Sequence, residues 1–336
     1  MSALPRISIL MPVRNEAMFL PAALQSLVRQ TCRSWELVVV DDGSSDTTPA
    51  ILADAARDDS RIRIIRREGG GLVAALNSGL AACRAPLLAR MDGDDICHPR
   101  RLELQATYLD SHPDTGLVAS NFRHFPRTTL KQGMLSYETW QNTLVNHDQI
   151  VHDLFVESPF VHPSVMLRRD LIERAGGYHD LGWAEDYDLW LRLAQSGTRF
   201  ARMNIPLFFW RDHPGRATRT MNEYSKEAFR ACKLYHLRQE FLRSTPRVVI
   251  AGAGLEGRAW HRLLAGAGIS VTSWVDVDPR RIGRVLHGSP VFGTNHLREI
   301  QDKILVAIGV RGAREQFREL IQPLSLKEGL DFICVA

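Results

Sequence analysis

Over residues 1–120, short apolar runs of strand length alternate with stretches whose apolar positions recur at helical spacing. Ile7–Val13 and residues 36–40, 61–66 and 86–91 are the expected strands. Between the first two, Leu20, Leu24 and Leu27 lie three or four positions apart, which is typical of a helix with one buried face. This alternation predicts an α/β domain with a mainly parallel sheet.

Residues 121–160 show no regular period, so their structure is not predicted. A strand at 163–167 and a helix at 184–195 follow. A longer basic helix over residues 222–242 stops at Thr245-Pro246, because proline breaks the helical pattern. A new strand at 248–251 then opens a second α/β pattern. We therefore predict one domain over residues 1–244 and a smaller one over residues 245–336.

Composition narrows the class of protein. With 45% apolar and 24% charged residues among 336, the chain is typical of a soluble globular protein with two cored domains. Its five cysteines are scattered and never spaced as C-x-x-C, which favours reduced thiols in the cytoplasm over disulfides or a zinc site. The sequence has no signal-peptide pattern, no apolar run of bilayer length and no nucleic-acid-binding motif. Neither a membrane span nor a nucleic-acid partner is expected.

Acidic side chains gather at three places in residues 1–190, each where a strand should end or a helix begin. The clusters are Asp41-Asp42, Asp92-Gly93-Asp94-Asp95 and Glu185-Asp186-Tyr187-Asp188. Carboxylates brought together repel one another unless a cation lies between them. A divalent metal carrying a nucleotide diphosphate would supply that cation, which leaves the third cluster to act as a base. The pattern therefore points to sugar transfer from an activated donor.

The second cluster has the spacing of a metal site. In an extended segment Asp92 and Asp94 point the same way, and Gly93 lets the backbone approach a ligand closely. Carboxylate oxygens suit Mg²⁺ or Mn²⁺, which would bridge the diphosphate and neutralise charge on the leaving group. An exposed acidic loop is the alternative. The cluster follows a strand, however, and ligands bind at that end of strands in open α/β sheets.

Other segments carry further candidates. A carboxylate at the start of the 184–195 helix is kept ionised by the helix dipole, so it could deprotonate an acceptor hydroxyl. Asp41 and Asp42 form either a turn or a pair of acceptors for a nucleoside. The turn over residues 12–16 either caps a helix or covers the nucleotide. His213 is a candidate metal or phosphate contact, although a lone histidine is more often structural.

These segments, in this order, resemble the family 2 glycosyltransferases of the GT-A fold over residues 5–240. The stretch from Gly70 to Gly79 is similar to the family's glycine-to-asparagine helix segment, and Gly176-Gly177-Tyr178 stands ahead of the base cluster. The resemblance implies an inverting enzyme that moves one sugar from a nucleotide-diphosphate donor to a hydroxyl acceptor. Cell-surface polysaccharide or glycolipid synthesis is the implied setting. The Q-x-x-R-W segment of processive members is absent from the sequence, which favours transfer of a single sugar.

The resemblance also implies residue roles. The nucleotide sugar would be bound by Pro12, Arg14, Glu16, Asp41, Asp42, Asn77 and Asp92. Mg²⁺ or Mn²⁺ would be held by Asp94, with Asp92 and His213 as further ligands. Asp186 is the implied base, with Glu185 as the adjacent alternative, and it takes the acceptor's proton during a single displacement. The donor base, the sugar and the sugar or lipid-linked acceptor stay unassigned.

The smaller domain carries a second candidate site. Gly252, Gly254 and Gly257 follow a strand as G-x-G-x-x-G, and Asp276 ends the next strand, which fits a dinucleotide fingerprint. The passage over residues 275–293 is similar to small Rossmann-type domains attached to sugar-modifying enzymes. NAD(P) is therefore a candidate ligand. Because no catalytic group stands beside the motif, we favour a ligand-binding, regulatory or scaffold role over redox chemistry.

Two other functions stay open at this point. A sugar nucleotidyltransferase is also built on an α/β sheet, but its first turn is usually glycine-rich and basic, unlike residues 12–16. A NAD-binding regulator with a degenerate first domain would have no need of all three acidic clusters. The arginine-rich stretch over residues 211–243 is compatible with contact to anionic lipid at the inner face of the membrane. A solvated helix face accounts for that stretch more simply.

Overall fold

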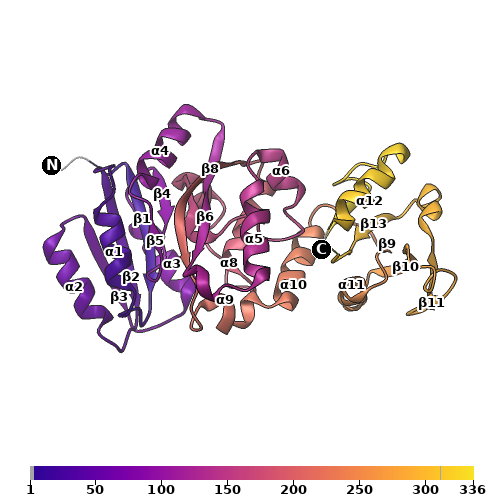
Figure 1. The fold of residues 1–336 in the computed structure, drawn as a ribbon, viewed down its shortest axis with the longest axis horizontal. Coiled ribbons are helices and arrows are strands. Elements are labelled where there is room, and N and C mark those ends of the chain that lie inside the picture. Colours follow the sequence, from indigo (N-terminus) through magenta and orange to yellow (C-terminus); the bar gives the residue numbers. More distant parts are fainter. Residues whose placement is uncertain (1–3, 311) are drawn as a thin grey trace. The chain divides into compact units, whose positions relative to one another are not determined.

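The computed structural model describes residues 4–310 and 312–336, which form two compact units (Figure 1). The first unit contains an eight-stranded sheet in the order β3-β2-β1-β4-β7-β6-β8-β5. The first four strands in that order are parallel, whereas β7 is antiparallel to β4 and β6, and β5 is antiparallel to β8. The strands are β1 (Ile7–Val13), β2 (Trp35–Asp42), β3 (Ile62–Arg67), β4 (Leu87–Arg90), β5 (Ile96–Cys97), β6 (Thr115–Phe125), β7 (Val165–Arg168) and β8 (Arg199–Arg211). The predicted α/β fold with a mainly parallel sheet is confirmed.

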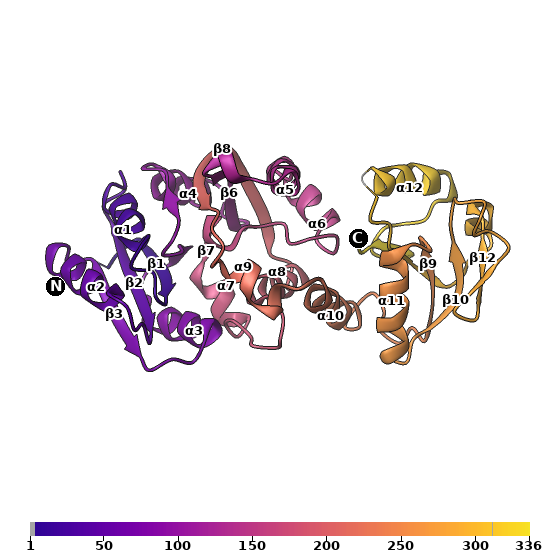
Figure 2. The same cartoon turned by 60° about the horizontal axis from the view of Figure 1, so that its bottom comes forward.

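Helices cover both faces of this sheet (Figures 1 and 2). They are α1 (Leu20–Val28), α2 (Thr48–Asp58), α3 (Leu72–Ala82), α4 (Arg101–Ser111), α5 (Gln132–Thr143), α6 (His147–His152), α7 (Arg169–Arg174), α8 (Glu185–Gln195) and α9 (Ala217–Thr220), with 3₁₀ turns η1 (Arg127–Thr129) and η2 (His162–Ser164). The apolar sides of α1, α2 and α4 share one core cluster with Ile9 and Met11 of β1. Helix α3 packs on the opposite face. A Cβ on its Gly79 would lie 2.2 Å from Leu10 Cδ1, so this helix needs glycine at its closest approach to the sheet.

The segment with no predicted structure contains the second half of β6 and then α5 and α6. Strand β6 is buried along most of its length, so its side chains do not alternate between apolar and polar. Its pairing with β8 also shifts register at several points between Thr115 and Phe122. The buried polar residues Ser120, Asn121 and His124 also interrupt the apolar run by which the other buried strands are recognised in sequence.

The second unit contains a six-stranded sheet in the order β11-β12-β10-β9-β13-β14, parallel except for the β11–β12 pair. Its elements are η3 (Asn222–Tyr224), α10 (Lys226–Leu237), β9 (Arg247–Ala251), α11 (Leu255–Gly266), β10 (Ser270–Val275), β11 (Val285–Leu286), β12 (Ser289–Phe292), η4 (Thr294–Arg298), β13 (Lys303–Val306), α12 (Ala313–Ile321), η5 (Gln322–Leu324) and β14 (Phe332–Cys334). No helix among the described residues combines the length and apolar character needed to cross a bilayer.

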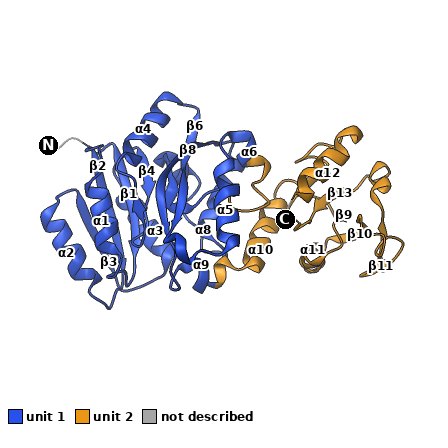
Figure 3. Ribbon diagram, in the orientation of Figure 1, with its two compact units in different colours: residues 1–150, 159–221 blue, residues 151–158, 222–336 orange. Residues whose placement is uncertain are grey.

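The two units divide at residue 222, ahead of the boundary near 245 that the sequence predicts (Figure 3). Residues 151–158 also belong to the second unit. The reason lies in the packing of α10 and the residues after it. Leu234, Leu237 and Phe241 join the same buried cluster as Val248 and Trp260, so this basic helix supplies core to the smaller sheet. Its sequence pattern, which ends at a proline, gives no sign of which sheet it covers.

Close packing requires glycine at the first and last glycines of the G-x-G-x-x-G motif, Gly252 and Gly257, which gives a test of the second unit. A Cβ at Gly257 would lie 1.8 Å from the Gly252 carbonyl oxygen, whereas a Cβ at Gly266 of the same helix meets nothing within 4 Å. We expect Gly257→Ala to lower the free energy of unfolding by about 3 kcal/mol or more, because backbone must move to admit the methyl group. Gly266→Ala should be neutral or stabilising by about 0.5–1 kcal/mol. Urea denaturation of the two variants checks this, and equal stabilities would contradict it.

Candidate active site

The second acidic cluster follows β4 at the carboxyl edge of the parallel strands. The turn after β1 lies against it, since a Cβ added at Gly93 would stand 2.8 Å from Val13 Cγ1 and 3.2 Å from Glu16 Cγ. The structure therefore brings the predicted nucleotide turn and the predicted metal cluster together. Gly93 is the residue that permits this approach.

Asp92, Asp94 and Asp95 form a compact oxygen cluster. Each offers one carboxylate oxygen within 4.8 Å of the others. Asp95 is fully buried; its Oδ1 accepts a hydrogen bond from the Arg211 backbone N–H at 2.6 Å, while its Oδ2 has no partner in residues 4–310 and 312–336. Burial, together with the neighbouring carboxylates, raises the pKa of Asp94 and holds the pKa of Asp95 well above its usual range. The cluster thus concentrates more negative charge than the surrounding protein neutralises.

Cationic side chains lie beside this cluster. His213 Nε2 is 2.8 Å from Asp94 Oδ2, and the Arg211 Nε donates to the Asp94 carbonyl oxygen at 2.6 Å. Phe19, which precedes α1, packs against both the His213 ring and the Arg211 guanidinium. Arg216 is also buried and acts electrostatically on the acidic cluster. The sequence predicts His213 as a metal or phosphate contact. In the structure its ring contacts Asp94, the predicted metal ligand.

The residues present fit a divalent cation. Three hard carboxylate oxygens lie close together, which is the donor set that Mg²⁺ or Mn²⁺ prefers. The buried Asp95 Oδ2 lacks a hydrogen-bond partner among the residues that the structure describes, and a bound cation would supply one. The sequence predicts Asp94, Asp92 and His213 as ligands, and it does not indicate that Asp95 joins this cluster. Its burial depends on β8, which lies far along the chain.

The predicted nucleoside residues line the ends of β1 and β2. Asp41 Oδ1 accepts a hydrogen bond from the Ser44 backbone N–H at 3.0 Å, and Ser44 Oγ in turn accepts one from the Asn15 N–H. Both carboxylate oxygens of Asp42 accept hydrogen bonds from the protein. One accepts from Arg67 Nε at 3.2 Å and the other from the Gly71 backbone N–H at 2.8 Å. Asp41 therefore faces the turn over residues 12–16, whereas Asp42 joins β2 to β3 and to the start of α3.

Within that turn, Pro12 is buried, Arg14 is exposed and Glu16 is half-buried. Burial, followed by the charges of Asp94 and Asp92, raises the pKa of Glu16 to about 8. Glu16 thus belongs to the same electrostatic system as the oxygen cluster, a link that the sequence does not reveal.

Asn77 is engaged within the protein. Its Nδ2 donates to the Tyr178 carbonyl oxygen at 2.8 Å, and its Oδ1 accepts the Tyr178 backbone N–H at 2.9 Å. The side chain therefore ties α3 to the loop ahead of α8. This geometry favours positioning of that loop over the direct donor contact that the resemblance implies.

The third acidic cluster opens α8, and its members differ in their surroundings. Glu185 is buried, with its Oε1 3.3 Å from His162 Nδ1, and His162 Nε2 lies 3.0 Å from the Tyr178 hydroxyl. Asp188 is paired with Arg192 at 2.7 Å. Asp186 is partly exposed and accepts the Tyr187 backbone N–H at 2.7 Å. Burial and the adjacent Glu185 hold the pKa of Asp186 well above its usual range. Of the two predicted bases, Asp186 is the residue that is less buried as a whole.

In the second unit, Asp276 contacts the backbone of the glycine motif, as the fingerprint predicts. Asp276 Oδ2 accepts the Ala253 backbone N–H at 2.7 Å and pairs with Arg281 Nη1 at 2.9 Å, while its Oδ1 accepts the Asp278 N–H. The carboxylate that a dinucleotide's ribose would use is therefore already bonded to the protein. The dinucleotide site at Gly252, Gly254 and Gly257 stays a prediction.

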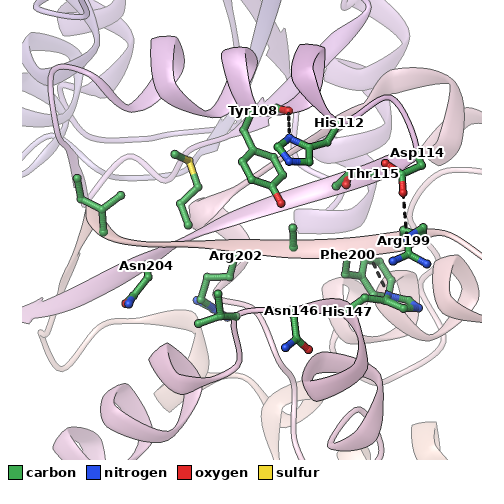
Figure 4. A pocket seen from close by; sticks show the side chains of 14 residues that line it. Tyr108, His112, Asp114, Thr115, Asn146, His147, Arg199, Phe200, Arg202 and Asn204 are labelled. Atoms are coloured by element: carbon green, nitrogen blue, oxygen red, sulfur yellow. Dashed lines mark hydrogen bonds and ion pairs between the residues drawn. The ribbon is translucent and has the colours of Figure 1, made fainter.

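A cavity of about 490 Å³ lies beside residues 199–205 of β8, at the other end of that strand from Arg211 (Figure 4). Tyr108 and His112 stack on each other with ring centroids 4.1 Å apart, and Asp114 pairs with Arg199 at 3.2 Å. These polar groups bond to each other, and none belongs to the acidic clusters. The cavity is separate from the candidate active site.

Known proteins share both the fold and this part of the sequence. The model for glycosyl transferase family 2 matches residues 8–176. The chain is 35% identical over 192 residues to the amylovoran biosynthesis glycosyltransferase AmsE of Erwinia amylovora, covering 56% of this chain and 67% of that protein. It is 30% identical over 243 residues to the O-antigen biosynthesis glycosyltransferase WbnJ of Escherichia coli, covering 71% and 90%.

Solved structures agree on the fold. The S. aureus TarS structure in complex with UDP-GlcNAc matches with a TM-score of 0.55 and 17% identity, covering 78% of this chain and 80% of that chain. The sheet order and this match show the GT-A fold. The chain belongs to glycosyl transferase family 2. The predicted enzyme class and fold are therefore confirmed.

Proposed function

We propose that this chain is an inverting, divalent-metal-dependent glycosyltransferase that moves one sugar from a nucleoside-diphosphate donor to a hydroxyl acceptor. The observation that carries the proposal is the oxygen cluster of Asp92, Asp94 and Asp95, with its unpartnered Asp95 Oδ2, beside the nucleotide turn. When bound, the metal would neutralise negative charge on the diphosphate. Asp94 is the principal proposed ligand, with Asp92 and Asp95 beside it.

We propose that basic side chains at and after the end of β8 contact the diphosphate. His213 and Arg211 already touch Asp94, and Arg216 lies within electrostatic reach of the same cluster. Asp41, on the turn side of β2, is the proposed nucleoside contact, with Pro12, Arg14 and Glu16 of the facing turn. Asp42 and Asn77 position the elements around this donor site through the hydrogen bonds described above.

Asp186 is the proposed base. Its raised pKa makes the ionised carboxylate a stronger base than a carboxylate with an ordinary pKa. As the acceptor oxygen forms its bond to the anomeric carbon, the bond from that carbon to the diphosphate breaks and the acceptor proton passes to Asp186. A single displacement of this kind inverts the anomeric carbon.

We infer that the acceptor is a sugar of a cell-surface polysaccharide or glycolipid, carried on a lipid. The UDP-Gal:alpha-D-GlcNAc-diphosphoundecaprenol beta-1,3-galactosyltransferase of Escherichia coli is 30% identical over 196 residues, covering 57% of this chain and 69% of that protein. A lipid-linked acceptor would bring the enzyme to the inner face of the membrane without a span of its own.

A thermal-shift experiment tests the donor site. UDP or GDP with Mn²⁺ at about 100 times Kd should add ~2.7 kcal/mol to the free energy of unfolding. For a domain of this size that corresponds to a rise in Tm of roughly 5–10 °C. EDTA should abolish the rise. NAD and NADP, tested in parallel, probe the glycine motif of the second unit. If only the dinucleotides raised Tm, the proposed donor site would lose its support.

A further inference from the structure

A buried triad of side chains stands behind the third acidic cluster, and the proposed mechanism so far gives two of its members no role. The triad consists of Tyr178, His162 and Glu185, with His162 of η2 in the middle. His162 Nδ1 lies 3.3 Å from Glu185 Oε1, and His162 Nε2 lies 3.0 Å from the Tyr178 hydroxyl oxygen. The exposed fractions are 3% for Tyr178, 7% for His162 and 4% for Glu185, so water does not compete for these contacts.

The direction of the hydrogen bonds in the triad follows from the chemistry of its members. Burial, followed by the positive charge of Arg90, lowers the pKa of His162, so its neutral ring has one donor and one acceptor nitrogen. Burial raises the pKa of the Tyr178 hydroxyl, which therefore keeps its proton. An ionised Glu185 only accepts hydrogen bonds. We therefore assign the ring proton to Nδ1, which donates to Glu185, while Nε2 accepts from Tyr178.

Both ends of the triad are attached to helices. At one end, the backbone N–H and carbonyl of Tyr178 both bond to the Asn77 side chain of α3. At the other end, Glu185 is the first residue of α8, and no side chain caps this helix at the preceding Ala184. The contact between Glu185 and His162 thus holds an end of α8 that no capping side chain holds.

We propose that His162, supported by Tyr178, is a positioning residue for sugar transfer: it holds Glu185 at the start of α8 and so fixes where the next residue, Asp186, presents its carboxylate. Glu185 is then an anchor for the helix and not the base. This rests on the proposed function, because it takes Asp186 as the group that accepts the proton.

The physical argument is that a base acts only at hydrogen-bond distance from the acceptor hydroxyl. A misplacement of about 1 Å can cost roughly a hundredfold in rate. Glu185 and Asp186 share a peptide bond in the first turn of α8, so a shift of one moves the other. The proposed donor contacts at Asp41 and Asp94 lie on other elements and do not depend on this turn. Loss of the anchor should therefore lower kcat and leave donor binding unchanged.

The experiment compares His162→Asn with His162→Gln. The amide of asparagine occupies the place of Nδ1 and can still donate to Glu185, whereas the amide of glutamine occupies the place of Nε2 and reaches Tyr178. Each variant leaves one buried partner without its hydrogen bond, so both should lose stability. We would measure kcat for transfer and the dissociation constant of UDP or GDP with Mn²⁺. Without substrate, NMR would measure hydrogen exchange of the Asp188 amide, which donates to the Ala184 carbonyl oxygen at 3.1 Å.

For His162→Gln we expect kcat to fall roughly 10- to 100-fold, with an unchanged dissociation constant and faster exchange of the Asp188 amide. His162→Asn should keep both kcat and exchange near those of the unmodified protein. Tyr178→Phe removes the hydroxyl that orients the ring, so its kcat should fall by less than that of His162→Gln.

His147→Gln is the control, because its ring lies beside the cavity of Figure 4, away from the acidic clusters. His147 Nδ1 accepts the Phe200 backbone N–H at 3.2 Å, so this variant also loses a histidine hydrogen bond. It should lose stability and keep kcat.

Equal kcat in His162→Asn and His162→Gln would overturn the inference, because the two variants would then differ from the unmodified protein only through stability. If His162→Gln did not fold, Glu185→Ala and Glu185→Gln would decide in its place. Glutamine still accepts the His162 proton and alanine does not, so equal kcat in that pair would equally refute the anchor. Asp186→Asn separates a failure of the proposed function. Normal transfer by Asp186→Asn would remove the base assignment itself, whatever the His162 variants do.

Discussion

Replacing Asp186 by asparagine is expected to leave donor binding intact and to lower kcat by about 10²–10⁴-fold, the usual contribution of a general base. The amide is nearly the same size as the carboxylate and can still accept the Tyr187 N–H, so the start of α8 should keep its shape. It cannot accept the acceptor's proton. Calorimetric titration of UDP or GDP with Mn²⁺, together with single-turnover transfer, measures the two effects separately.

Glu185→Gln is the matched control, because it changes the adjacent carboxylate in the same way. Glu185 is one cause of the raised pKa of Asp186. Transfer requires ionised Asp186, so activity falls as pH drops through that pKa. Removing the Glu185 charge lowers the pKa of Asp186, and the acidic limb should move to lower pH with activity retained. Activity in Asp186→Asn and its loss in Glu185→Gln would assign the base to Glu185 instead.

Asp94→Ala is expected to abolish the Mn²⁺-dependent binding of nucleoside diphosphate and to lower transfer by about a thousandfold. Stabilisation of charge by a metal is worth several kcal/mol in the transition state, and each ~1.4 kcal/mol is a factor of ten in rate. Asp94 is the proposed principal ligand and also holds His213 at 2.8 Å, so its loss removes both contacts. Nucleotide binding with and without EDTA checks this prediction.

The same variant should not destabilise the metal-free protein. Burial raises the pKa of Asp94 above its value in the unfolded chain, so the folded state binds more protons and loses stability as pH rises through that pKa. Burying this carboxyl group therefore costs stability at neutral pH, and removing it should leave Tm unchanged or higher. Asp110→Ala, at an exposed ion pair with Arg6, is the control and should affect neither binding nor transfer. Retention of Mn²⁺-dependent binding in Asp94→Ala would refute the ligand assignment.

Local patterns were enough for much of this protein. The predicted strands and helices over residues 1–120 recur in the structure within a residue or two, because continuous apolar runs mark strands buried on both faces and the 3.6-residue period marks helices with one buried face. The D-x-D segment could be recognised in the sequence because its two carboxylates lie only two positions apart. The ordered set of segments was enough to indicate the family, which the comparisons then confirmed.

What the tertiary structure alone decided is the environment of each charge. Asp95 stands in a loop that reads as ordinary in the sequence, and the hydrogen bond that its buried carboxylate accepts from the Arg211 backbone N–H comes from β8, far along the chain. The bonds that separate Asp41 from Asp42, and those that occupy Asn77, come from residues up to 101 positions away. The same holds for α10, which covers the second sheet. Sequence spacing fixes which side chains share a face of one element, but desolvation and ion pairing depend on elements that meet only in the folded chain.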